Sequence, residues 1–342
     1  MAPATLSGTL PKSNRHQSIA LALVGDPVSV VPSLVSPVQD GDHRDNDDGV
    51  VDPAFSFPGY VISPPSFDGI VNLVVVCCHA IFHPSPSIVD FPLYSPHEER
   101  NWHLAPFQQS DPKTGKPGEH ETFLAHLSAG IDTLTTGPWA GNSLLVFSGG
   151  ATKRNLTTVS EARSYYHAAL AQRLAQGHKH GGFVRTLFEK NRLLLEEQAT
   201  DSFQNLLFSI LLFRQTTGIY PHQVRVITHA FKAKRFLELH APALRWPLER
   251  IRVCGIDPVM SAAEYEDTVK GEGIYGYAPW VKDALGTGEV LDKKRRQRGW
   301  NEDALVHLSE GLENSVRRLL CGEHVDVLPW STAAGGPENH AT

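Results

Sequence analysis

The chain has 342 residues, 41% of them hydrophobic, and its 31 basic and 37 acidic side chains give a formal net charge of −6. This balance argues against a nucleic-acid or anionic-membrane binder, because both partners demand a basic field on the protein. No uninterrupted apolar run approaches the roughly 18 residues that a bilayer crossing needs, so the sequence predicts no membrane span.

The first 67 residues differ in composition from the rest. Nine of the 24 prolines fall in the first 65 residues, among Ser and Asp and without sustained periodicity, so we expect 1–67 to be a disordered segment. The four cysteines make no disulfide framework, which favours a cytoplasmic location. Residues 1–25 carry Lys12 and Arg15 but no acid and weakly resemble a transit peptide, so a mitochondrial location is the alternative.

From residue 71 onward, short apolar runs alternate with segments of helical period. The predicted strands are 71–78, 143–147, 192–195, 224–227 and 251–255. The predicted helices are 119–136, 160–176 and two more that run through 203–211 and 236–239. This alternation predicts an α/β domain over 68–260, a Rossmann-like open and mostly parallel sheet with helices on both faces.

Residues 261–342 are predicted to form a C-terminal extension that ends in a flexible tail. A helix is expected near 302–320, because five apolar side chains recur there on one side of a helix. They are Leu305, Leu308, Leu312, Val316 and Leu319. The basic run Lys293–Arg298 is better explained as a solvated loop than as a nuclear signal or an anion-binding patch.

In an open parallel sheet, ligands bind beyond the carboxyl ends of the strands, where loops and helix N-termini converge. The five predicted strands are followed by His79, by Ser148-Gly149-Gly150, by Glu196 through Ser202, by Thr228-His229 and by Gly255-Ile-Asp257. Because each of these ends is polar or contains glycine, we expect them to line one site.

The chemistry of these residues suggests their roles. Glu161 and Glu196 are the predicted catalytic residues, since a carboxylate at this edge can exchange a proton or hold a cation. Lys232 and Arg235 are expected to meet an anion, and the two glycines after strand 143–147 are expected to donate backbone amides to it. The predicted ligand-binding residues are His79, Ser148, Gly149, Gly150, Thr200, Asp201, Asn205, Thr228, His229, Lys232 and Arg235.

Structural explanations remain open beside these roles. A glutamate at 161 also favours the positive end of its own helix, and any of Thr200, Asp201 and Ser202 can serve as an N-cap. The cations at 232 and 235 can equally form a solvated helix face.

Several familiar motifs are missing from the sequence. His79 and His83 lack the helix and the glutamate of an HExxH site, so no metal site is predicted. GxGxxG, Walker and GxSxG patterns do not occur, so neither a dinucleotide fingerprint nor a hydrolase elbow is supported.

Four motifs nevertheless follow one another in a fixed order over residues 70–260. They are Val75-Val-Cys-Cys-His79, then Leu144-Leu-Val-Phe-Ser-Gly-Gly150 with Ser160-Glu-Ala162, then Glu196-Glu-Gln-Ala-Thr-Asp-Ser-Phe-Gln-Asn205, then Val226-Ile-Thr-His-Ala-Phe-Lys-Ala-Lys-Arg235. This set resembles the domain-of-unknown-function 218 family, which includes the bacterial YdcF-, SanA- and ElyC-like proteins, and this chain looks like its fungal branch. The resemblance implies a Rossmann-like fold with the site on these motifs.

The chain also departs from the family pattern. His229 stands where the family has Ser, and Lys232 stands where it has His, which replaces a group that titrates near neutrality by a cation. Cys77, Cys78 and His79 replace the glycines that are common after the first strand. If the family histidine transfers a proton, this branch only binds its ligand.

The sequence therefore predicts a protein that binds, or acts on, a small anionic metabolite of nucleotide-like or phosphorylated character. The resemblance permits S-adenosylmethionine or a divalent cation as a cofactor. The alternative is a non-catalytic adaptor or sensor with a vestigial pocket, for which the N-terminal segment and the basic run provide partner contacts.

Overall fold

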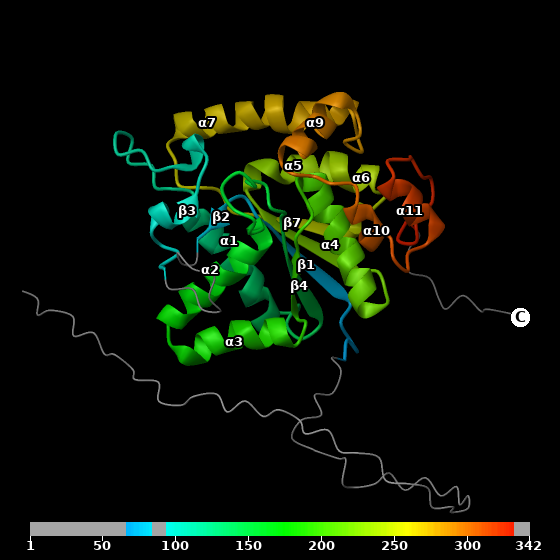
Figure 1. Ribbon diagram of the computed structural model, residues 1–342, viewed down its shortest axis with the longest axis horizontal. Helices are drawn as coiled ribbons and strands as arrows, with labels where there is room; N and C mark the ends of the chain where they lie inside the picture. The colour runs from blue at the N-terminus through cyan, green and yellow to red at the C-terminus, as the bar shows by residue number, and fades with distance from the viewer. Residues whose placement is uncertain (1–65, 84–93, 332–342) are drawn as a thin grey trace, which may run out of the picture. The chain divides into compact units, whose positions relative to one another are not determined.

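The apolar runs form a single five-stranded parallel sheet. A computed structural model describes residues 66–83 and 94–331 (Figure 1). The sheet consists of β1 (Asn72–Cys77), β4 (Ser143–Ser148), β5 (Leu193–Glu196), β6 (Gln223–Thr228) and β7 (Ile251–Gly255). Their order across the sheet is β5-β4-β1-β6-β7, and every neighbouring pair is parallel. This is the order of a Rossmann-like, doubly wound sheet, so the predicted α/β fold is confirmed.

The predicted disordered segment 1–67 and the predicted flexible tail lie almost wholly outside the described residues. A short antiparallel pair, β2 (Ile81–Phe82) with β3 (Trp102–His103), was not predicted and follows the first strand. Within the described ranges, none of the helices combines the length and hydropathy that a bilayer crossing requires.

Helices cover both faces of the sheet, as predicted. One face carries α1 (His120–Thr135), α2 (Glu161–Ala175) and α3 (His178–Glu189). The other face carries α4 (Ser202–Thr217) and an irregular helix made of η4 (Ala230–Lys232), α5 (Ala233–Arg235), the π-helical η5 (Phe236–His240) and α6 (Ala241–Ala243).

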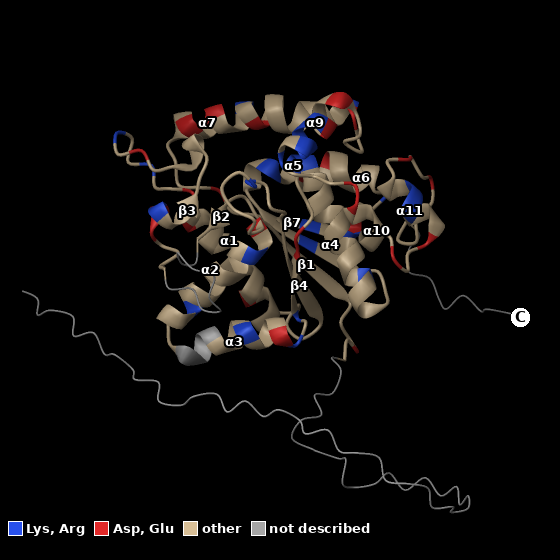
Figure 2. Cartoon of the chain, viewed as in Figure 1, with Lys and Arg blue, Asp and Glu red and all other residues tan. Residues whose placement is uncertain are grey.

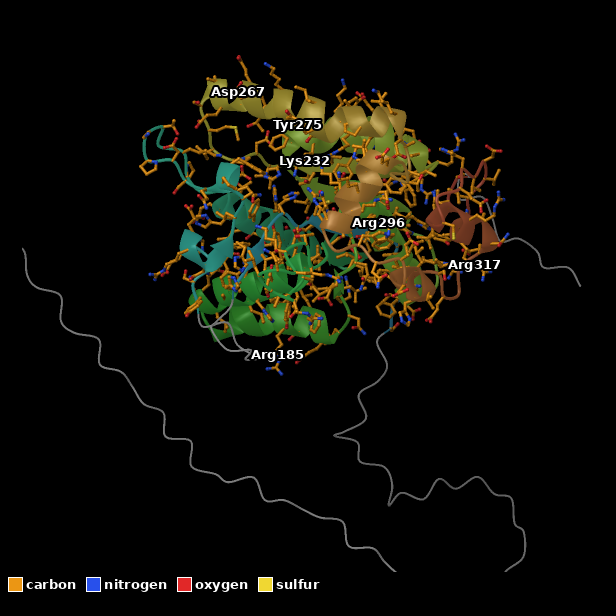
Figure 3. The ribbon with its side chains drawn as sticks, turned by 45° about the horizontal axis from the view of Figure 1, so that its top comes forward. Arg185, Lys232, Asp267, Tyr275, Arg296 and Arg317 are labelled. Carbon is orange, nitrogen blue, oxygen red and sulfur yellow. The ribbon has the colours of Figure 1, made fainter. Side chains whose placement is uncertain are left out.

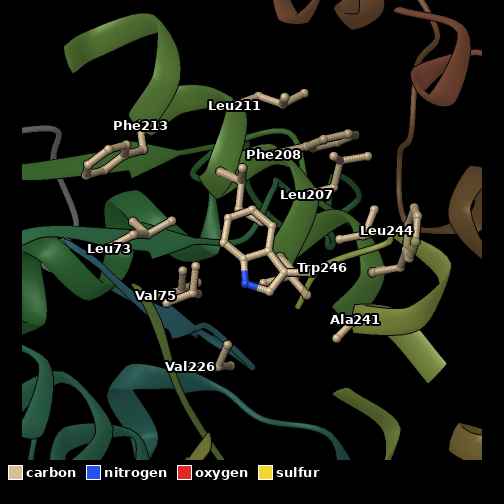
Figure 4. Packing of buried hydrophobic residues seen from close by; sticks show 14 of the residues in the cluster. Leu73, Val75, Leu207, Phe208, Leu211, Phe213, Val226, Ala241, Leu244 and Trp246 are labelled. Atoms are coloured by element: carbon tan, nitrogen blue, oxygen red, sulfur yellow. The ribbon is translucent and has the colours of Figure 1, made fainter. Parts of the chain in front are cut away.

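The strands are apolar throughout because both of their faces are buried. In β1, Val74 and Val76 pack with the first helical layer, whereas Leu73 and Val75 pack with the second. Figure 4 shows the second layer, in which the Trp246 indole lies between Val75 of β1 and the α4 side chains Leu207, Phe208 and Leu211. Each such side chain contributes about 1.5–3 kcal/mol when it is fully buried, so this two-sided burial fixes the central strand between its layers.

The C-terminal extension packs on the same core instead of forming a second one. It contains α7 (Ala262–Gly271), the π-helical η7 (Glu272–Tyr277), α8 (Ala278–Lys282), α9 (Glu289–Gln297), α10 (Ala304–Leu308) and α11 (Asn314–Leu320). Val316, Leu319 and Trp330 join the cluster that α4 forms on the sheet.

Two predictions about the extension are wrong. The expected helix 302–320 is two helices, because the chain turns between them at Gly311, whose φ of 67° is a left-handed conformation that favours glycine. The basic run Lys293–Arg298 is no loop, because it forms the last turns of α9 and turns Arg295 into the protein.

Candidate functional site

The carboxyl ends of the five strands converge as predicted. Cys77 lies beside Ser148, Ser148 beside Glu196, and Thr228 beside Gly255 in the strand register. The connections from β1 and β6 lead to helices on opposite faces of the sheet, and the crevice between two such strands is where open α/β sheets bind ligands. His79 and Thr228 occupy this position.

Three histidine rings gather at this crevice. His79 Nε2 lies 3.1 Å from Thr228 Oγ1, and the His79 ring stacks on that of His229 with centroids 4.5 Å apart. His126 of α1 approaches both rings, at 5.7 Å from His79 and 5.0 Å from His229. His126 was not among the predicted site residues, although its position three residues after Phe123 places it on the apolar face of its helix.

Burial keeps these imidazoles uncharged. It lowers the pKa of His79 and of His229 well below the usual value and that of His126 to about 4, and the nearby charge of Lys232 lowers each further. His126 Nε2 lies 2.8 Å from the carbonyl oxygen of Ile256, which can only accept, so Nε2 carries the proton and Nδ1 holds a lone pair.

Several ring nitrogens in this cluster have no hydrogen-bond partner within the described part of the chain. His126 Nδ1 and both ring nitrogens of His229 are buried without a hydrogen bond, and Glu119 Oε2 comes no closer to His229 Nε2 than 4.0 Å. An unsatisfied buried polar group costs about 1–3 kcal/mol, so such groups call for a water or a ligand.

Lys232 faces the histidines. Its Nζ lies 3.4 Å from His79 Nδ1, and among the described residues no carboxylate approaches it within the 4.0 Å of an ion pair. Burial, aided by the charge of Arg235, lowers the pKa of Lys232 to about 8. An unpaired and partly buried ammonium is costly, because little water remains to solvate it.

Arg235 lies on the same side of the helix but has partners of its own. Its Nε is 3.3 Å from Glu272 Oε1, and its Nη1 donates to the carbonyl oxygen of Gly276 at 3.2 Å. Both partners belong to η7, which packs on η4. In Figure 3 the helix that carries the labelled Asp267 and Tyr275 runs over Lys232. Arg235 therefore fixes the extension above the crevice.

Glu161 is the first residue of α2, and Ser160 caps that helix by accepting from the amide of Arg163. The Thr152 hydroxyl donates to Glu161 Oε1 at 2.5 Å. Burial raises the pKa of Glu161, against the opposing effects of that hydrogen bond and of the charges on Arg298, Lys153 and Lys232. The carboxyl group thus faces several cations and can exchange a proton closer to neutral pH than an exposed glutamate.

Glu196 belongs to a buried hydrogen-bond network that joins two strand ends to α4. Ser148 Oγ donates to Glu196 Oε2 at 2.5 Å, and Glu196 Oε1 accepts the amides of Gln198 and Ala199. Asn205 Nδ2 donates to the Ser148 carbonyl oxygen at 2.9 Å. Burial raises the pKa of Glu196 to about 7, although these hydrogen bonds oppose the shift. These three residues shape the loops around the site.

The two glycines after β4 serve packing and not anion binding. The Gly149 amide donates to the Glu196 carbonyl oxygen and the Gly150 amide to that of Ala199, so the expectation that both donate to a ligand is wrong. A Cβ at Gly149 would lie 2.9 Å from the Glu161 side chain, which explains the need for glycine at that position.

Asp201 and Thr200 connect the site to the extension. Asp201 is the N-cap of α4 and accepts the Gln204 amide at 2.9 Å, as its structural explanation predicted. Its second oxygen lies 2.6 Å from Nε of the buried Arg295. Arg298 Nη1 donates to the Thr200 carbonyl oxygen at 2.8 Å. The basic run Lys293–Arg298, which was predicted to be a solvated loop, therefore contacts the residues at the edge of the site.

The described residues contain no group of three or more His, Cys, Asp or Glu side chains arranged to hold a metal ion. The three histidines do not make such a group, because Nε2 of His126 is occupied by a carbonyl oxygen and both ring nitrogens of His79 face Thr228 and Lys232. The site is thus dominated by cations and neutral imidazoles.

Comparison with known proteins yields one informative relative. The chain is 28% identical to the uncharacterised protein YOR238W of Saccharomyces cerevisiae, over 69% of this chain and 86% of the yeast protein. No family model matches the chain, so the resemblance to the domain-of-unknown-function 218 family rests on the motifs alone. No solved structure matches it either.

Proposed function

We propose that the crevice between β1 and β6 binds a small anionic metabolite, nucleotide-like or phosphorylated, and that the chain is a diverged member of the domain-of-unknown-function 218 family. Lys232 carries the proposal. Its ammonium group is partly buried, lies against a neutral histidine and has no carboxylate within 4.0 Å among the described residues. An anionic ligand would supply the missing charge.

The histidine cluster supports the same proposal. The unpartnered nitrogens of His126 and His229 lie beside His79, which contacts Lys232. A neutral imidazole can accept a hydrogen bond from a polar ligand or donate one to it, and adds no charge to the site. A bound metabolite would therefore satisfy both the cation and the unpaired ring nitrogens.

The same residues suggest how an enzyme would work at this site. Glu161, whose pKa burial raises, would exchange a proton with the ligand. Glu196, whose pKa burial raises to about 7, would do so only after its hydrogen bonds to Ser148 and to the amides of Gln198 and Ala199 open. His79 would stay neutral, because burial lowers its pKa, and accept a hydrogen bond through Nδ1, the atom that faces Lys232. S-adenosylmethionine and a divalent cation are the proposed cofactors to be tested. The proposed location of the protein is the cytoplasm.

A ligand panel read by thermal shift tests the binding function. It contains nucleotides, sugar phosphates, S-adenosylmethionine and divalent cations. A ligand at about 100 times its Kd adds about 2.7 kcal/mol to the free energy of unfolding. Lys232→Met should abolish the shift, whereas Lys234→Met, which changes an exposed lysine two residues away, should preserve it. A shift that survives Lys232→Met, or a panel without any hit, contradicts the proposal.

The adaptor function stays as the second candidate because apolar side chains are exposed on the covering helix. Ile274 is 51% and Tyr275 73% exposed on η7, and Tyr265 and Val269 of α7 are exposed as well. Such side chains favour contact with another protein. An adaptor with a vestigial pocket would leave the whole panel without effect and would lose its partner on Tyr275→Ser.

A further inference from the structure

Lys232 and three further cations approach the carboxyl edge without an ion-pair partner. The other three are Lys153 in the loop after β4, Lys294 on α9, and Arg298, the residue that follows α9. Among the described residues, none of the four has a carboxylate within 4.0 Å. We refer to Lys153, Lys232, Lys294 and Arg298 as the cation cluster. Figure 2 shows basic residues gathered around α5 and α9 at this end of the sheet.

The four cations are held in place by neutral partners. Lys153 Nζ donates to the carbonyl oxygen of His103, and Arg298 Nη1 donates to that of Thr200. Lys294 Nζ lies 3.5 Å from the carbonyl oxygen of Tyr275, and Lys232 Nζ 3.4 Å from His79 Nδ1. Carbonyl oxygens and imidazoles orient a cation without neutralising it, so among the described residues none of the four cations is neutralised by a direct ion pair.

Contacts link the segments that carry these cations. Lys294 Nζ lies 3.5 Å from the carbonyl oxygen of Tyr275 on η7, which packs on the η4 turn that carries Lys232. The end of α9 also touches the loop after β4, because a Cβ at Gly299 would lie 3.3 Å from the carbonyl oxygen of Ala151.

The nearby carboxylates have other partners. Asp201 is paired with Arg295, Glu272 with Arg235 and Glu119 with Lys116. Glu161 accepts a hydrogen bond from Thr152. Three elements of the fold thus bring four positive charges to an edge where the acidic groups are already engaged.

We propose that this edge binds a ligand with two linked phosphate groups, one at Lys232 and the second at Lys153, Lys294 and Arg298. A diphosphate, free or within a nucleoside diphosphate, presents at least two negative charges and several acceptor oxygens, which suit three ammonium groups and one guanidinium group as donors. This inference rests on the proposed function, since Lys232 belongs to both. It assigns the C-terminal extension half of the binding site.

Calorimetric titration of the full chain with orthophosphate, pyrophosphate, a nucleoside diphosphate and the matching nucleoside tests the inference. All titrations are run at one ionic strength, because salt screens exposed charges. We expect pyrophosphate to bind at least about ten-fold tighter than orthophosphate, which corresponds to about 1.4 kcal/mol. If the nucleoside diphosphate binds more tightly than pyrophosphate, the ligand is a nucleotide. If the two bind with equal affinity, the diphosphate group alone is recognised.

Variants separate the two phosphate positions. Lys294→Met and Arg298→Gln should each weaken pyrophosphate binding about ten-fold and leave orthophosphate binding within about two-fold. Lys293→Met removes an exposed charge one residue away on the same helix and should change neither affinity. An equal loss in Lys293→Met, or equal affinities for orthophosphate and pyrophosphate, overturns the inference.

The outcome also distinguishes this inference from the proposed function. Orthophosphate binding that depends on Lys232, without any gain from the second phosphate, leaves the proposed function standing and refutes the diphosphate site. Pyrophosphate binding that depends on Lys294 and Arg298 but not on Lys232 refutes the proposed function at the crevice and, with it, the assignment of one phosphate to Lys232.

Discussion

Asp201 uses its two carboxylate oxygens for two different parts of the chain. One oxygen accepts the Gln204 amide and caps α4, and the other lies 2.6 Å from Nε of Arg295 on α9. Both side chains are about nine-tenths buried, at 11% and 9% exposure. A single aspartate therefore starts a core helix and attaches the extension to it.

The first prediction concerns substitutions that separate the helix-capping role of Asp201 from its ion pair with Arg295. Asp201→Asn retains an N-cap acceptor but leaves the Arg295 guanidinium buried without its carboxylate, so we expect a loss of about 3 kcal/mol in the free energy of unfolding. Adding Arg295→Met should recover most of that loss in urea unfolding. The exposed pair Arg318 and Glu323 supplies the control, since Glu323→Gln should cost less than about 1 kcal/mol. A loss in Asp201→Asn no larger than in Glu323→Gln contradicts this account.

The second prediction concerns the unpaired ammonium of Lys232. Its pKa is about 8 in the folded protein and 10.5 in the reference state, so between these values the unfolded chain binds more protons and stability rises with pH. Below about pH 8 the full free-energy cost of burying the charged Lys232 side chain lowers the stability of the folded protein. Lys232→Met should therefore stabilise the ligand-free protein by about 2 kcal/mol at pH 7, and the gain should shrink toward pH 10.5.

Chemical denaturation from pH 7 to pH 10 measures this effect. Lys234→Met should leave the pH profile unchanged, because Lys234 is exposed and paired with Glu238 on the surface. A Lys232→Met protein that is less stable than the wild type at pH 7 would show that the ammonium group is favourably placed even without a ligand.

Glu196 gives a prediction of opposite sign. Its pKa is about 7 when folded and 4.5 in the reference state, so the folded protein binds more protons between these values and stability falls as pH rises through this window. Glu196→Gln removes the ionisation and should gain about 2 kcal/mol relative to the wild type between pH 4.5 and pH 8.

The matched variant is Glu196→Ala. It removes the acceptor of the Gln198 and Ala199 amides and should be destabilised by about 2 kcal/mol or more even at pH 4.5. Equal pH profiles for the wild type and Glu196→Gln would mean that Glu196 ionises normally in the folded protein.

His126 makes the protein sensitive to acid. Its pKa is about 4 when folded and 6.5 in the reference state, so the unfolded chain binds more protons between these values and stability declines as pH falls below 6.5. His126→Phe should flatten this decline by up to about 1.4 kcal/mol per pH unit, whatever its effect at neutral pH. Substitution of the exposed His307 serves as the control and should leave the slope as it is. An unchanged slope in His126→Phe refutes the shifted pKa.

The strands of the sheet could be predicted from the sequence because a buried strand has a recognisable pattern of apolar residues. A strand covered on both faces must be apolar throughout, and the run around Val74 has that property. The carboxyl-edge rule then places His79 and Thr228 together once the strands are parallel. These inferences need only local pattern and topology.

The remaining parts of the site depend on tertiary contacts that leave no local pattern. Lys293 and Arg295 look alike in sequence, yet Lys293 is exposed and Arg295 is paired with an aspartate 94 residues away. His126 differs from its apolar neighbours, but only the folded protein shows that a carbonyl oxygen of the distant Ile256 fixes its proton. The amides of Gly149 and Gly150 were expected to be free because their partners lie on another strand and its loop.

The far end of the extension is anchored by tryptophan. Trp330 is 1% exposed, its indole nitrogen donates to the Leu244 carbonyl oxygen at 2.7 Å, and its ring lies 5.7 Å from that of Trp246. Tyr220 stands against the same ring at 4.9 Å. These aromatic chromophores come together only when the extension is docked on the core, so the intrinsic near-ultraviolet circular dichroism and emission of the unlabelled protein report that docking.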